Sequence, residues 1–67
     1  MIYTVIYEEK DTGNMGTLTF APRRHDKSYA WAEFESKYAQ PGQVPVMIMP
    51  GQHIVYFASD ISFTNVA

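Results

Sequence analysis

The sequence contains no cysteine, which excludes disulfide bonds and thiolate metal sites. The lack of cysteine fits a reducing compartment, so we expect a cytoplasmic location. Charges are sparse and slightly unbalanced, with five basic against seven acidic residues and a formal net charge of -2. Because nucleic-acid-binding domains usually carry a basic excess or a basic face, this balance argues against general nucleic-acid binding.

Long hydrophobic runs are also missing. The longest apolar stretches are Val44–Pro50 and Ile54–Ala58, well short of the ~20 residues that a membrane-spanning helix needs. The N-terminus leads directly into a strand pattern, without the basic start and small-residue cleavage site of a signal peptide. We therefore expect no membrane association, and the 67 residues predict a single domain covering 1–67.

No motif of a known catalytic or cofactor site is present. The chain has no glycine-rich phosphate loop, no H-E-x-x-H metal spacing and no G-x-S-x-G nucleophile turn. His53 lies within an apolar strand pattern, where a hydrogen-bonded structural histidine is the ordinary role. We expect no enzymatic activity, no cofactor and no metal.

Apolar residues are dense, at 46% of the chain, and aromatic residues make up 15%. Ile2–Glu8 is apolar on both faces, which predicts a central strand. Met15–Ala21 alternates Leu18 and Phe20 with threonines, and a turn over Lys10–Asn14 joins the two segments. The pair predicts a β-hairpin.

A helix is predicted from a cap at Asp26 or Ser28 to about Tyr38 or Ala39, where Pro41-Gly42 ends it. Trp31, Phe34 and Tyr38 form one apolar stripe at helical spacing. Trp31 lies at the centre of this stripe, so we expect it at the centre of the core.

Three further strands are expected over Val44–Met49, Gln52–Ala58 and Ile61–Asn65. Pro50-Gly51 predicts a turn after the first of them. The predicted fold is therefore α+β, with one mostly antiparallel sheet, one helix packed on one face and the order β-β-α-β-β-β.

The opposite face of such a sheet lacks a cover. A helix about 10 Å wide spans about three strands that lie ~4.8 Å apart. The remaining apolar face predicts burial against another chain, and two-fold symmetry makes a homodimer the first expectation. A monomer would leave that face for a different protein.

Charged and aromatic side chains near the helix supply the candidate binding residues. The basic run Arg23–Lys27 precedes the helix, as a solvated loop or an anion site, and carboxylates at Glu8, Glu9 and Asp11 form an acidic hairpin end. Tyr29 is expected opposite the apolar stripe, beside Glu33. The candidate partner-binding residues are Arg23, Arg24, Tyr29, Glu33, Tyr3, Tyr7 and Tyr56.

The segments Ser28–Phe34 and Met49–His53, with Tyr38 and Pro41-Gly42 between them, resemble small bacteriophage-encoded accessory proteins. The resemblance implies a non-enzymatic protein-binding module that inhibits or modulates a bacterial host factor in the host cytoplasm. One alternative is a small nucleic-acid-binding domain, in which sheet aromatics stack on bases and basic loop residues hold phosphates. The other alternative is a subunit of a structural assembly.

Overall fold

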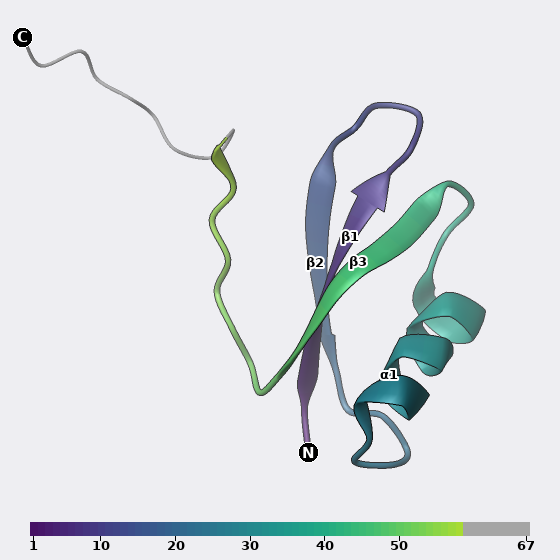
Figure 1. Cartoon of the computed structure of the whole chain (residues 1–67), viewed down its shortest axis with the longest axis vertical. Coiled ribbons are helices and arrows are strands. Elements are labelled where there is room, and N and C mark those ends of the chain that lie inside the picture. Colours follow the sequence, from purple (N-terminus) through teal and green to yellow (C-terminus); the bar gives the residue numbers. More distant parts are fainter. Residues whose placement is uncertain (59–67) are drawn as a thin grey trace, which may run out of the picture.

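The computed structural model describes residues 1–58 and places three strands and one helical segment there. The strands are β1 (Tyr3–Glu9), β2 (Met15–Phe20) and β3 (Gln43–Pro50), and they form an antiparallel sheet in the order β2-β1-β3 (Figure 1). Helix α1 (Lys27–Glu33) continues directly into a short π-helix, η1 (Phe34–Tyr38). The predicted α+β class and the central position of the first strand are confirmed.

Strand β1 is buried on both faces. Val5 and Tyr3 point to the helix side and belong to the core, whereas Thr4 and Ile6 are buried on the far side. This burial explains why the segment is apolar in every position, since a central strand has no face that water reaches freely.

The hairpin between β1 and β2 runs in one continuous register, from Tyr3 opposite Phe20 to Glu8 opposite Met15. Its turn uses Gly13 at φ 75°, in the left-handed region that glycine enters without strain. Gly16 lies opposite Tyr7, and a Cβ added there would stand 2.5 Å from the tyrosine ring. The missing side chain at Gly16 thus makes room for the Tyr7 ring on the helix face.

Helix α1 begins at the predicted cap. The Asp26 carboxylate accepts the Ser28 backbone N–H at 3.0 Å, which satisfies one of the free donors of the first turn. At the other end, the Ala39 N–H donates to the Phe34 carbonyl at 2.8 Å, and this wider i→i+5 bond defines the π turn. The π turn brings the Tyr38 ring to 4.8 Å from the Phe20 ring.

The predicted core stripe is wrong at its centre. Ala30 and Phe34 contact the sheet as part of the core, whereas Trp31 is only half-buried, beside Lys27 and Ile48. Trp31 and Ala30 are neighbours in sequence, and each lies on one face of the helix with Phe34, so the spacing is consistent with either of them in the core. The small Ala30 side chain lets the helix lie close to the sheet. With Ala30 facing the sheet, Trp31 lies at the side of the helix and is partly exposed.

The predicted fourth strand is also wrong. Residues 52–57 form no strand and follow Gly51, whose φ of 89° reverses the chain as the Pro50-Gly51 turn predicts. We call residues 52–58 the arm. Figure 1 shows the arm on one side of the sheet and α1 on the other. The predicted fifth strand, 61–65, and the turn at 59–60 lie outside the described residues.

A buried hydroxyl attaches the arm to the sheet. Thr4 is fully buried, and its hydroxyl donates to the Gly51 carbonyl at 2.8 Å. The same oxygen lies 3.1 Å from the Thr19 hydroxyl and 3.1 Å from the His53 backbone N–H. Because a hydroxyl has one proton, Thr4 accepts from both of these groups. One side chain of the central strand therefore joins β1, β2 and the arm.

Candidate functional site

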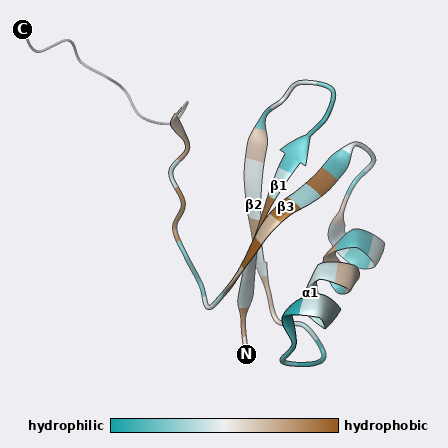
Figure 2. Cartoon of the chain, in the orientation of Figure 1, coloured by the Kyte–Doolittle hydropathy of each residue, from teal (hydrophilic) through white to brown (hydrophobic). Residues whose placement is uncertain are grey.

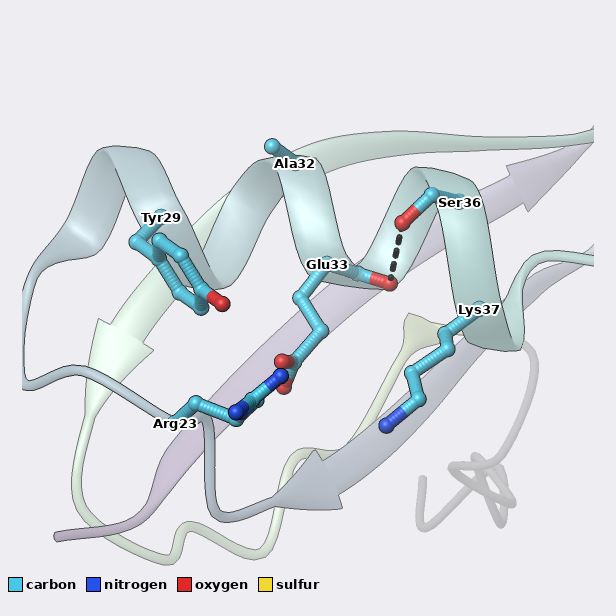
Figure 3. A pocket seen from close by; sticks show the side chains of 6 residues that line it. All are labelled: Arg23, Tyr29, Ala32, Glu33, Ser36 and Lys37. Carbon is cyan, nitrogen blue, oxygen red and sulfur yellow. Dashed lines mark hydrogen bonds between the residues drawn. The ribbon is translucent and has the colours of Figure 1, made fainter.

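The first candidate is an open pocket of about 450 Å³ beside the helix (Figure 3). Five helical residues and Arg23, from the loop before the helix, form its wall. Figure 3 shows the Arg23 and Glu33 side chains pointing toward one another. Its lining residues are Arg23, Tyr29, Ala32, Glu33, Ser36 and Lys37.

The pocket combines one sequestered carboxylate with two cations. Glu33 is 8% exposed, whereas Arg23 and Lys37 are exposed at the pocket rim. The Ser36 hydroxyl turns back to the helix and donates to the Glu33 backbone carbonyl at 3.4 Å. Because Arg23 faces Glu33, the groups that remain for a bound partner are the Lys37 ammonium and the Tyr29 ring. This set suits the carboxylate side chain of a partner protein.

The structure brings four of the predicted binding residues together around this pocket. Tyr29, Glu33 and Arg23 line it, and the Arg24 guanidinium lies 5.7 Å from the centre of the Tyr29 ring. At that distance the cation interacts with the ring face. Tyr29 is half-buried and lies beside Glu33 and Ser36, as its spacing predicts.

The other three predicted residues lie elsewhere. Tyr3 is a core residue whose hydroxyl lies 3.0 Å from His25 Nδ1, and the Tyr7 ring packs 5.8 Å from the Phe34 ring. Both rings therefore pack on the helix side of the sheet. Tyr56 belongs to the arm, where it is 74% exposed next to Ile54 at 82%.

The basic loop before the helix is largely occupied by intramolecular contacts. Asp26 caps the first turn, His25 contacts Tyr3 and Arg24 lies on Tyr29. The capping carboxylate of Asp26 accepts the Ser28 N–H, so this donor is not available to an anion at the helix start. His53 also departs from its expected place in a strand, since it is exposed and its Nε2 lies 2.6 Å from the Pro50 carbonyl.

The second candidate is the free edge of β2, which sequence reasoning missed. In an antiparallel pair, opposite residues alternate between exchanging two backbone hydrogen bonds and exchanging none. The Glu9 N–H donates to the Asn14 carbonyl at 2.8 Å, which fixes the phase of this alternation. The hydrogen-bonding residues of β2 are then Gly16, Leu18 and Phe20, and those whose N–H and C=O point away from β1 are Met15, Thr17 and Thr19.

The edge formed by β3 is different. The Gly51 N–H donates to the Ile2 carbonyl and the Lys10 N–H to the Gly42 carbonyl, which fixes the pairing at both ends of the strand. Pro45 and Pro50 then fall in the outward row, where neither has an N–H to offer. A register shift opposite Ile6/Tyr7 further interrupts this edge.

Strand β2 has none of these protections. Its six residues, MGTLTF, include no proline and no charge. In Figure 2 the visible part of β2 is tan to pale, whereas the end of β1 is teal. Natural sheets usually interrupt an open edge with proline, charge or a bulge. The absence of both proline and charge over Met15–Phe20 is the sequence signal for this edge, although only the strand order shows that the segment is an edge.

Met15 is exposed at the free edge, and further apolar side chains are exposed on β3, at the other edge of the sheet. Met15 lies at the start of β2, and Met47 lies across the sheet on β3, opposite Ile6. Met47 is 51% exposed, and Met15 and Val46 are exposed as well. Methionine side chains adapt to irregular partner surfaces, so Met15 supplements the backbone groups of the edge.

No protein family model, no curated protein and no solved structure matches the chain. Within residues 1–58, no helix has both the length and the apolar character needed to cross a membrane. The same part of the chain holds no group of three or more histidine, aspartate or glutamate residues arranged to bind a metal ion.

Proposed function

We propose that this chain is a small, non-enzymatic protein-binding module that docks a partner strand on the free edge of β2. The observation that carries the proposal is the unprotected edge itself: Met15, Thr17 and Thr19 direct backbone donors and acceptors outward. Strand addition to such an edge obtains its affinity from main-chain hydrogen bonds and its specificity from alternate side chains.

The surroundings of the edge support the same function. Met15 is exposed at the edge, Met47 is exposed across the sheet on β3, and Arg23 and Lys37 stand at the rim of the helix pocket. A partner strand on β2 would meet an apolar surface on one side and cations on the other. Such a combination is typical of a protein contact.

The resemblance to small bacteriophage accessory proteins extends the proposal to its biological use. On that basis the bound partner is a bacterial protein in the host cytoplasm, whose activity the chain inhibits or modulates. Blocking a partner requires only a stable contact, so the absence of a catalytic motif from the sequence is compatible with this role.

The test compares three tagged versions of the chain in affinity capture from bacterial lysate, with the captured proteins quantified. The versions are the wild type, Thr17→Lys and Val46→Lys. Thr17 and Val46 are both exposed, on the β2 and β3 edges respectively, so each variant adds one lysine to one edge. We expect a partner that the wild type and Val46→Lys retain and Thr17→Lys loses.

Equal capture by all three versions would contradict the proposal, because a charge in the centre of the docking edge would then be harmless. Both variants are checked by circular dichroism and a thermal melt. A melt that matches the wild type shows that loss of capture is a loss of contact and not of folding.

A further inference from the structure

We infer that, in the isolated protein, the strand that docks on β2 is the β2 strand of a second copy, in antiparallel orientation about a two-fold axis beside Thr17. This inference rests on the proposed function: without the bacterial partner, a second copy occupies the edge that the partner strand takes on binding. Its basis is the combination of the strand order, the outward backbone groups of β2 and the charges at the two ends of that strand.

The hydrogen-bonding pattern fixes the register. The outward residues of β2 are centred on Thr17, so a two-fold axis there pairs Thr17 with the partner's Thr17. Met15 then lies opposite the partner's Thr19, and Thr19 opposite the partner's Met15. This register is the one in which every outward residue of β2 (Met15–Phe20) gains a partner, with two backbone hydrogen bonds for each pair.

The side chains of β2 are compatible with pairing to a second β2 strand. Because β2 carries no charge, self-pairing places no like charges opposite one another. Thr17 is exposed on the sheet face opposite the helix, where its pairing with the partner's Thr17 across strands is favourable. Pairing therefore removes open backbone groups without burying an unpaired charge.

The two ends of β2 have opposite charge. The hairpin end carries the carboxylates of Glu8, Glu9 and Asp11 against one lysine, Lys10. The end that follows Phe20 carries Arg23, Arg24 and Lys27 against one carboxylate, Asp26. Antiparallel pairing brings the acidic end of each copy beside the basic end of the other.

Strand order also explains why the assembly would stop at two copies. Each sheet has the order β2-β1-β3, so joining the β2 edges gives a six-stranded sheet with β3 at both outer edges. Those edges contain Pro45, Pro50 and the register shift opposite Ile6/Tyr7. A proline-interrupted edge is a poor template for a further strand, so the dimer is closed.

The test uses a charge swap at the proposed axis, with the mass measured by light scattering. We expect about twice the 7.7 kDa chain mass for the wild type and for the control Val46→Lys. Thr17→Lys alone and Thr17→Glu alone each place like charges opposite one another, so each runs at the single-chain mass. An equimolar mixture of the two variants restores the double mass, because lysine then meets glutamate.

Disulfide cross-linking gives an independent test. Because the sequence contains no cysteine, a single introduced cysteine can form a disulfide only with that of another copy. In the proposed register Thr17→Cys places its thiol opposite that of the partner, at the ~5.5 Å Cα separation of a hydrogen-bonded pair, which lies within the range for a disulfide. We expect oxidised Thr17→Cys to form a covalent dimer faster than the control Val46→Cys.

A single-chain mass for the wild type would overturn the self-pairing. Cross-linking of Thr17→Cys no faster than that of Val46→Cys would overturn it as well. If edge-dependent capture of another protein persists in either case, the proposed function stands and only the self-pairing fails. A failure of capture together with a single-chain mass overturns both.

Discussion

Phe34 is the side chain that joins the helix to the sheet. It is 1% exposed, it belongs to the core with Val5 and Ala30, and its ring packs 5.8 Å from the Tyr7 ring. We expect Phe34→Ala to lower the free energy of unfolding by about 3–5 kcal/mol, the usual effect of truncating a buried aromatic residue. Urea denaturation followed by circular dichroism measures this change.

Trp31→Ala is the matched comparison for Phe34→Ala, because it truncates a larger aromatic residue of the same helix. Trp31 is half-buried at the shoulder of the helix, so we expect a smaller loss of stability than at Phe34. An equal or larger loss for Trp31→Ala would place the tryptophan back in the centre of the core and contradict the packing described above.

Residue roles were predictable to the extent that they follow from local spacing. A cap at Asp26 or Ser28 follows from residue type, and the structure has it at Asp26. The position of Tyr29 beside Glu33 follows from the helical period and is also found. The prediction that Trp31, and not Ala30, lies in the core was wrong. Periodicity shows which residues share one face of a helix, but it does not show which face packs on the sheet. The face that packs on β1 is the one whose small side chain, Ala30, allows the helix to approach the strand closely.

At the scale of elements, the arm is held to the sheet through the buried Thr4 hydroxyl. Thr4→Val keeps the shape of the side chain and removes the partner of the Gly51 carbonyl and the His53 N–H. We expect a loss of about 1–3 kcal/mol, because such buried groups lose their hydrogen bonds. The arm should also be released, and chymotrypsin should then cut after Tyr56 faster than in the wild type.

Thr19→Val is the control for Thr4→Val. Thr19 contributes a single hydroxyl contact to Thr4 and none that is described to the arm, so cleavage at Tyr56 should stay close to the wild-type rate. Equal acceleration by both variants would show that the hydroxyl pair, and not the contact with the arm, holds this region.

Three strands and the helix were predictable because each has its own local pattern and turn signal. The arm has the same alternating pattern as a strand, with Val55 and Phe57 half-buried and Ile54 and Tyr56 exposed. It forms no strand, because a strand depends on a neighbouring strand as well as on its own pattern. The strand that precedes it, β3, lacks outward N–H groups at Pro45 and Pro50, and it offers little for the returning chain to bind.

For the whole molecule, the arrangement of edges is the feature that the sequence could not show. Strand order arises from contacts between distant segments, such as the pairing of β1 with β3. Only in the order β2-β1-β3 does the uncharged segment Met15–Phe20 become an exposed edge and the proline-rich segment Gln43–Pro50 a protected one. The asymmetry of the two edges is the basis of the proposed function.

The most direct measurement of this account is backbone amide hydrogen exchange along β2, residue by residue, at low and high protein concentration. The Gly16, Leu18 and Phe20 amides bond to β1, so they should be protected at both concentrations. The Met15, Thr17 and Thr19 amides point outward, so they should exchange rapidly in dilute solution and become protected as copies pair. Exchange of these three amides at the same fast rate at both concentrations would contradict pairing of the β2 edge.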